Sequence, residues 1–325
     1  MFQALRRVFC LLLALSTLFM ASCSMRVLSS LNILPAPEED EEEEYTPSEE
    51  FFGLGVHEPE GFVFSGRIFI VGDSTACSTY SSTRVEAQDL MGWGKYLNYY
   101  FLPEDQDRDG AQGVSVYNYA VSGASSLSYT TSDGYSYLKE YLSRGDYLFI
   151  QFGHNDENPA AAISAKLGMD EVSAEGKNEN GLYSFEWILN EYYVQYARSV
   201  GAVPVLLSPI ARLDSESGKA SVESHLPYRD AMQRFASEEN IAFFDMTALT
   251  EEFYNGLVSE QGREATLHLH AYSAADRKTI DVTHLSRYGA FRVAGLVADA
   301  VLKCPVALSN FVMEPQEEVL PREKN

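Results

Sequence analysis

The feature that most constrains the fold is a regular alternation of apolar runs with helical patterns, which begins at Gly66. Short runs rich in β-branched and aromatic residues predict five strands, at 67–71, 114–120, 146–152, 203–208 and 241–245. Helical periodicity lies between and after them, at 94–101, 135–142, 182–200, 228–239, 247–257 and 287–302. This alternation predicts an α/β fold, a five-stranded parallel sheet with helices on both faces.

The first 22 residues have the pattern of a secretory signal peptide. Arg6 and Arg7 precede an apolar run that is too short to span a bilayer comfortably. The run ends in Met20-Ala21-Ser22-Cys23, which resembles a bacterial lipobox. We therefore expect Cys23 to be lipidated, giving an exported lipoprotein anchored to the membrane only through its lipid. An ordinary signal peptide that happens to contain a cysteine is the alternative.

Residues 23–65 predict an acidic, disordered linker behind this anchor. Glu38–Glu50 holds nine of the chain's 47 acidic residues and no basic one, and like charges in a block repel and solvate. The rest of the chain is still acidic, which argues against a nucleic-acid partner. The sequence thus divides into a signal peptide (1–22), a linker (23–65), a folded domain (66–304) and a polar, frayed tail (305–325).

Four cysteines do not indicate a disulfide framework. Cys10 and Cys23 belong to the N-terminal signal, and only Cys77 and Cys304 remain in the folded domain. They lie at opposite ends of that domain, so we interpret both as small buried apolar residues. Two histidines at 268 and 270 could share one face of a strand as metal ligands do, but an exposed polar strand is the better interpretation.

Two long polar segments, 158–181 and 259–280, interrupt the alternation. Loops of this kind are typical of insertions over a binding face, although mobile surface excursions would look the same. Several tyrosines, including Tyr80, Tyr99 and Tyr129, could stack on sugar rings or simply pack in the core.

A candidate nucleophile follows the first predicted strand directly. The strand stops at Gly72-Asp73, and Ser74 comes next. In an open α/β sheet, ligands bind outside the carboxyl ends of the strands, so a serine at this point is well placed to react. Alternatively, Asp73 or Ser74 merely caps the next helix.

A candidate base and its orienting acid lie near the end of the domain. Asp281 and His284 are separated by two residues, so the carboxylate can reach the imidazole Nδ1 and leave Nε2 free. The same residues would also fit a helix start capped by Ser286 or Thr283.

Donors for an oxyanion hole follow the second and third strands. Gly123 lets the backbone approach a ligand closely, and Asn155 can offer a side-chain N–H. His154, beside Asn155, is expected to support the loop. Because each block ends a parallel strand, all of them should open onto one edge of the sheet.

Four blocks of the sequence, taken together, resemble the SGNH (GDSL-like) hydrolases: Gly72-Asp73-Ser74, Gly123, Gly153-His154-Asn155-Asp156 and Asp281-Val282-Thr283-His284. Further matches to the rhamnogalacturonan acetylesterase group are Gly92-Trp93-Gly94 and Thr283-His284-Leu285. The resemblance covers roughly 66–302. It implies the flavodoxin-like SGNH fold, Ser74 as nucleophile, His284 as base and Asp281 as its orienter. It also implies an oxyanion hole made by the Ser74 amide, the Gly123 amide and the Asn155 side chain, with Asp73 in support.

One departure concerns the substrate. The acetylesterase group commonly has arginine after the block-two glycine, whereas this chain has Ala124. An α/β-hydrolase, which also runs serine, acid, histidine, is excluded because its nucleophile elbow is Gly-x-Ser-x-Gly and Ala76 replaces the last glycine.

The expected function is removal of short acyl groups, acetyl above all, from carbohydrate, with no metal or organic cofactor. The alternatives within enzymes are an SGNH lipase or thioesterase and a carbohydrate acetyltransferase. An inactive glycan-binding surface lipoprotein is the alternative from another class.

Overall fold

The computed structural model describes residues 58–103 and 113–315, all within one compact unit. The predicted lipobox and most of the predicted linker lie outside the described residues. The centre of the unit is a parallel sheet of β1 (Arg67–Gly72), β2 (Ser115–Asn118), β3 (Tyr147–Gln151), β6 (Val203–Leu207) and β9 (Ala242–Phe244). The strands lie in the order β2-β1-β3-β6-β9, which is the flavodoxin-like order. All five predicted strands are confirmed, with ends shifted by at most two residues.

Successive side chains of the central strands enter two separate cores, because neighbouring residues of a strand point to opposite faces. Ile68, Ile70 and Phe149 pack into one core, and Phe69 and Ile150 into the other. Both faces of these strands are apolar, as expected for a parallel sheet covered on both sides.

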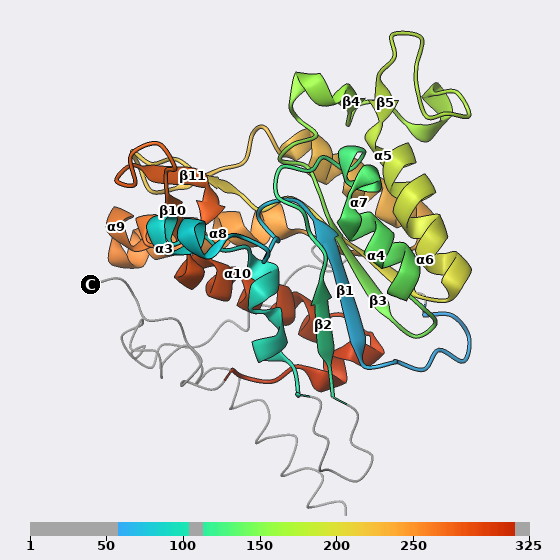
Figure 1. The fold of residues 1–325 in the computed structure, drawn as a ribbon, viewed down its shortest axis with the longest axis horizontal. Helices are drawn as coiled ribbons and strands as arrows, with labels where there is room; N and C mark the ends of the chain where they lie inside the picture. The colour runs from blue at the N-terminus through green and yellow to red at the C-terminus, as the bar shows by residue number, and fades with distance from the viewer. Residues whose placement is uncertain (1–57, 104–112, 316–325) are drawn as a thin grey trace, which may run out of the picture. The chain divides into compact units, whose positions relative to one another are not determined.

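Helices cover both faces and make the predicted three layers (Figure 1). On one face lie α10 (Arg287–Lys303), α8 (Met246–Gln261) and two short 3-10 helices, Trp93–Lys95 and Leu97–Tyr100. On the other lie α4 (Asp133–Tyr141), α7 (Leu226–Glu239) and a continuous helical stretch, Phe185–Val200, made of α5 (Phe185–Ile188), a π-helical segment (Leu189–Val194) and α6 (Gln195–Val200).

The remaining elements are small and lie in the connections. They are α3 (Ser82–Gln88), α9 (Arg263–Leu267), the 3-10 helices Ser128–Thr131, Pro159–Ala161 and Met169–Glu171, and the strand pairs β4 (Ile163–Ser164) with β5 (Tyr183–Ser184), β7 (Arg212–Leu213) with β8 (Ala220–Ser221), and β10 (His270–Tyr272) with β11 (Ile280–Leu285).

The predicted helix at 94–101 is wrong in type, because the chain forms two 3-10 helices there. Gly92 explains this local geometry. A Cβ at Gly92 would lie 2.4 Å from the backbone of Ala76 and Cys77, so this segment is held against the turn after β1 rather than wound as one helix.

The boundaries predicted for the linker and the tail also need correction. A 3-10 helix, Ala307–Phe311, buries Leu308 in the core, and Phe64 packs on Phe311 with ring centroids 5.1 Å apart. The described parts of the predicted tail and linker therefore belong to the fold, because their apolar residues cover one end of the sheet. Cys77 and Cys304 are both free and buried, as expected. Among the described residues, no helix is long and apolar enough to cross a membrane.

Candidate active site

Ser74 lies in a tight turn immediately after β1. The Asp73 carboxylate accepts hydrogen bonds from the N–H and the hydroxyl of Thr75, at 2.9 and 2.8 Å, and the Cys77 N–H bonds back to the Asp73 carbonyl at 3.1 Å. The first helix after this turn, α3, begins only at Ser82 and is capped by Ser81. The helix-capping interpretation of Asp73 and Ser74 is therefore wrong, and the turn holds Ser74 at the carboxyl edge of the sheet.

Asp281 and His284 lie in β11, not at the start of a helix. In a regular strand, residues three apart point to opposite faces. Here the pairing of β10 with β11 is irregular, and Asp281 Oδ1 accepts the backbone N–H groups of Thr283 and His284 at 2.9 and 3.0 Å. This local turn brings the two side chains together, while Ser286 caps the following helix α10.

The structure joins these three side chains in one hydrogen-bonded chain. His284 Nε2 lies 2.9 Å from Ser74 Oγ, and His284 Nδ1 lies 2.9 Å from Asp281 Oδ2. Burial tends to raise the pKa of Asp281, but hydrogen bonds from His284 and its charge lower it to about 2. The carboxylate is thus ionised near neutral pH and fixes the imidazole with Nε2 facing the serine.

The two predicted donor residues flank this chain from the next strands. Gly123 has φ +81°, a conformation that favours glycine, and a Cβ there would meet no atom within 4 Å. Glycine is therefore required here by the backbone rather than by space. Asn155 Nδ2 donates to the Ala124 carbonyl at 3.0 Å, which ties the two donor loops to each other and leaves one amide hydrogen available. Within the described chain, the N–H groups of Ser74 and Gly123 donate to no other backbone or side-chain group.

A buried glutamine at the end of β3, which the sequence did not indicate as a site residue, supports the Ser74 turn. Gln151 Oε1 accepts from Trp93 Nε1 at 2.8 Å and from Thr75 Oγ1 at 3.2 Å, while its Nε2 donates to the Ser208 carbonyl at 3.2 Å. Its signal in the sequence was a polar residue inside the apolar run 147–152. Tyr80, also partly buried, donates its hydroxyl to the Ser74 carbonyl at 2.5 Å.

Asp73 and His154 both lie buried beside the reacting groups. Burial raises the pKa of the Asp73 carboxyl, although the hydrogen bonds from Thr75 oppose that shift. Burial holds the pKa of His154 well below its usual value, helped by His225, whose ring packs edge-on at 4.3 Å. His154 is therefore neutral near pH 7, and its buried ring packs against His225.

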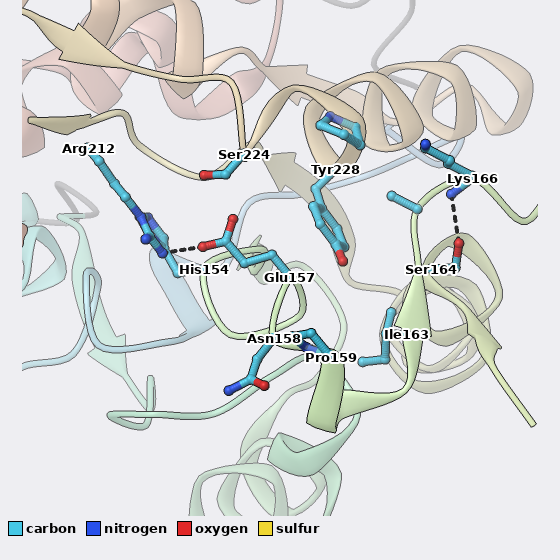
Figure 2. Close-up of a pocket in the computed structure, with 12 residues that line it drawn as sticks. His154, Glu157, Asn158, Pro159, Ile163, Ser164, Lys166, Arg212, Ser224 and Tyr228 are labelled. Carbon is cyan, nitrogen blue, oxygen red and sulfur yellow. Dashed lines mark hydrogen bonds and ion pairs between the residues drawn. The ribbon is translucent and has the colours of Figure 1, made fainter. Parts of the chain in front are cut away.

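A cavity of about 760 Å³ is lined by chain neighbours of Asn155, namely His154 and Glu157, but its lining includes neither Asn155 nor Ser74. Figure 2 shows Arg212 reaching Glu157 in an ion pair, with Asn158, Lys166 and Tyr228 around the same space. His225 Nδ1 lies 3.3 Å from the second oxygen of Glu157. Residues 158–166, from the first predicted insertion, supply much of the lining, so that insertion does lie over the sheet edge.

The two histidines at 268 and 270 and the tyrosines singled out in the sequence lie in different environments. His270 is buried and bonds the Asp281 carbonyl at 3.1 Å, so the expected exposed polar strand is wrong at this position. His268 belongs to the end of α9. No group of three or more His, Cys, Asp or Glu side chains in the described residues could hold a metal ion. Tyr129 is fully buried and packs in the core, whereas Tyr80 and Tyr99 are partly exposed.

Comparison with known proteins identifies the family. A family model described as GDSL-like lipase/acylhydrolase matches residues 68–297. The chain belongs to this family. It is accordingly a carboxylic ester hydrolase, and the matched region contains Ser74, Gly123, Asn155, Asp281 and His284.

Two curated relatives from Bacillus subtilis (strain 168) align along nearly their whole length. The rhamnogalacturonan acetylesterase RhgT is 26% identical over 249 residues, which cover 76% of this chain and 94% of the relative. The probable rhamnogalacturonan acetylesterase YesY is 27% identical over 254 residues, 77% of this chain and 99% of the relative. A solved structure, the YxiM protein of Bacillus subtilis, superposes with a TM-score of 0.54 at 25% identity, covering 75% of this chain and 58% of that one. The resemblance predicted from the sequence blocks is confirmed.

Proposed function

We propose that this chain is a carbohydrate acetylesterase in which Ser74, His284 and Asp281 form a catalytic triad. The observation that carries the proposal is the position of His284, which lies 2.9 Å from both Ser74 Oγ and Asp281 Oδ2. The names of the two Bacillus relatives support acetyl groups on a polysaccharide as the substrate.

In the acylation step, Ser74 Oγ attacks the carbonyl carbon of the acetyl ester and passes its proton to His284 Nε2. The negative charge on the former carbonyl oxygen is held by the Ser74 and Gly123 N–H groups and the remaining Asn155 amide hydrogen. The intermediate then collapses, the bond to the sugar oxygen breaks, and His284 returns its proton to that oxygen. Water, activated by His284, finally attacks the acetyl-Ser74 ester and releases acetate.

The first prediction tests the triad. Ser74→Ala and His284→Ala should each lower kcat on an aryl acetate by several orders of magnitude, and the double variant should be little worse, because the residues act as one unit. Serine-directed phosphonate labelling followed by peptide mass analysis should mark Ser74 in the wild type. Turnover close to wild type in Ser74→Ala would exclude this serine as the nucleophile.

The second prediction separates an acetylesterase from a lipase. Glu157, Arg212 and Lys166 line the cavity together with apolar residues such as Ile163 and Pro227, so charged groups interrupt its apolar lining. An alkyl chain gains about 0.8 kcal/mol for each CH₂ only where it is buried in apolar surroundings. We expect kcat/KM on aryl esters to peak at acetate, to fall by butyrate and to vanish at octanoate. A steady rise from acetate to octanoate would contradict the carbohydrate substrate but not the hydrolase.

Two alternative functions, an acetyltransferase and an inactive glycan-binding protein, can be distinguished from an acetylesterase by assay. An acetyltransferase would pass acetyl to an added sugar acceptor in preference to water, and mass spectrometry of the acceptor detects this. An inactive glycan-binding protein would bind polysaccharide but release no acetate. We further propose that the chain is exported and lipidated at Cys23.

A further inference from the structure

A group of exposed tyrosines lies on the edge of the sheet, outside the catalytic centre. Tyr117, Tyr137 and Tyr141 expose 39%, 48% and 46% of their surfaces, which sets them apart from the buried aromatic residues of the two cores. Tyr119, partly buried, lies between them. We call these four residues the tyrosine track. Large exposed apolar side chains that gather in one area commonly mark a binding surface.

The rings of the track are held by contact with one another and with the core. Tyr117 lies flat on Phe69, with centroids 5.1 Å apart and planes 17° apart. Tyr119 contacts Tyr137 at 5.6 Å, and Tyr137 stacks on Tyr141 at 6.4 Å and 25°. Tyr117 belongs to β2, the edge strand, and Tyr119 directly follows that strand. Tyr137 and Tyr141 belong to α4, so regular elements position three of the four rings.

Three hydroxyl groups of the track differ from those of several tyrosines that pack in the core. Tyr129, Tyr193 and Tyr228 each donate to a backbone carbonyl, at 2.9, 2.5 and 2.8 Å. By contrast, the hydroxyls of Tyr117, Tyr119 and Tyr137 have no hydrogen bond to another described residue, although Tyr141 is hydrogen-bonded to Glu140. Each of these rings thus presents a flat apolar face with a free polar tip, a combination suited to a ligand that is both ring-shaped and hydroxylated.

The track begins beside the catalytic edge of the sheet. The Tyr119 N–H bonds the Ile70 carbonyl and the Val121 N–H bonds the Gly72 carbonyl, both at 2.9 Å. Tyr119 therefore lies beside the end of β1. Only Asp73 separates the last residue of that strand, Gly72, from Ser74. From Tyr119 the track continues along α4, away from the site. The cavity lined by His154 and Glu157 follows β3, on the other side of β1 in the sheet order.

We propose that the tyrosine track is a second glycan-binding surface, on which the polysaccharide stacks its sugar rings while an acetyl group is presented to Ser74. This inference rests on the proposed function, because a polymeric substrate must extend beyond the reacting sugar. The track gives that extension a direction, along β2 and α4, and a chemistry, contact between aromatic rings and the weakly apolar faces of sugars. It acts on affinity and leaves the reacting groups untouched.

The test compares a polymer with a small ester in the full chain. In the Tyr137→Ala/Tyr141→Ala variant, KM for acetylated rhamnogalacturonan, the polysaccharide named in two relatives, should rise about tenfold with kcat unchanged. The rate on 4-nitrophenyl acetate, which is too small to reach α4, should stay within about twofold of the wild type. Tyr137→Phe/Tyr141→Phe keeps the rings and should restore most of the affinity. Leu302→Ala, an equally exposed apolar residue on α10, is the matched control and should change neither value.

A gel containing the same polysaccharide separates the possible failures. The wild type should be retarded and the double alanine variant less so. If the wild type hydrolyses the aryl ester but releases no acetate from the polymer, the polysaccharide is not the substrate. Retardation in the gel then still tests whether the tyrosine track binds the polysaccharide. Equal KM and equal mobility of wild type and variant would overturn the track. So would sedimentation showing that the tyrosines instead join two copies of the chain.

Discussion

Asn155 is held by one hydrogen bond, and at the residue scale this decides how its loss should appear. One hydrogen of its amide is donated to the Ala124 carbonyl at 3.0 Å, which holds the side chain in place, and in the proposed mechanism the other is donated to the substrate oxygen. A donor that is fixed before the reaction stabilises the developing negative charge without reorganising.

We predict that Asn155→Ala lowers kcat by about 10²–10³-fold and leaves KM within a few-fold, because one prepositioned oxyanion donor is lost. Steady-state kinetics on an aryl acetate measures both values. Asn98→Ala, at an exposed asparagine of a 3-10 helix, is the control and should resemble the wild type. If Asn155→Ala instead lost its thermal transition, the residue would be holding the loop rather than serving the reaction.

The strands and most helices follow from hydrophobic patterning, whereas several connecting elements do not. The five apolar runs predicted the sheet because burial on both faces demands them. Asp281 and His284 were correctly paired, but the strand that carries them was not predicted. Its irregular pairing with β10 depends on partners eight or more residues away, such as His270 opposite Leu285. The 3-10 helices around Trp93 were missed for a similar reason, since close contact with Ala76 and Cys77 overrides the local helical pattern.

At the candidate site, the residues of the proposed mechanism were predictable, whereas the buried polar residues that hold them were not. Ser74, Gly123 and Asn155 each follow a predicted strand, so the topology alone brings them to one edge. Gln151 and Asp156 are buried polar residues whose partners come from distant segments, Trp93 and Ser126. No local pattern in the sequence indicates such pairs.

At the scale of elements, Asp156 links two loops, and its burial predicts how the stability of the fold depends on pH. It accepts from the Ser126 N–H at 2.9 Å and the Gly153 N–H at 3.0 Å, and so joins the loop after β2 to the loop after β3. Burial raises the pKa of Asp156 to about 7 despite these hydrogen bonds. At a pH between about 4 and about 7, the folded protein therefore keeps a proton on Asp156. The unfolded chain, in which the pKa is about 3.9, has released it.

Because the folded pKa is the higher one, this group makes the fold less stable as the pH rises from about 4 to about 7. Asp156→Asn cannot ionise, so we predict a flatter dependence of Tm on pH over that window. Each kcal/mol of pH-dependent change in the free energy of unfolding corresponds to roughly 2–4 °C in Tm. Calorimetry at four or five pH values measures the slope. Asp170→Asn, at an exposed position, should keep the wild-type slope. Parallel slopes for wild type and Asp156→Asn would show that the carboxyl stays ionised throughout.

At the scale of the whole chain, the hydrolase family is shown by the match over residues 68–297, whereas export and lipidation are a separate proposal. The net charge of −23 is unfavourable for binding an anionic membrane surface directly, so attachment requires something other than the folded surface. In our proposal, the lipid on Cys23 supplies this attachment.

We predict that Cys23→Ser moves the expressed protein from the membrane fraction to the soluble fraction while kcat on an aryl acetate stays unchanged. The lipid would be lost, but the site built around Ser74 lies among the described residues, which begin at residue 58. Fractionation with immunoblotting, together with mass analysis of the N-terminal peptide, measures both lipidation and location. Cys10→Ser, within the signal peptide, is the matched control and should remain with the membrane. Membrane association that survives in Cys23→Ser would mean that another segment holds the protein there.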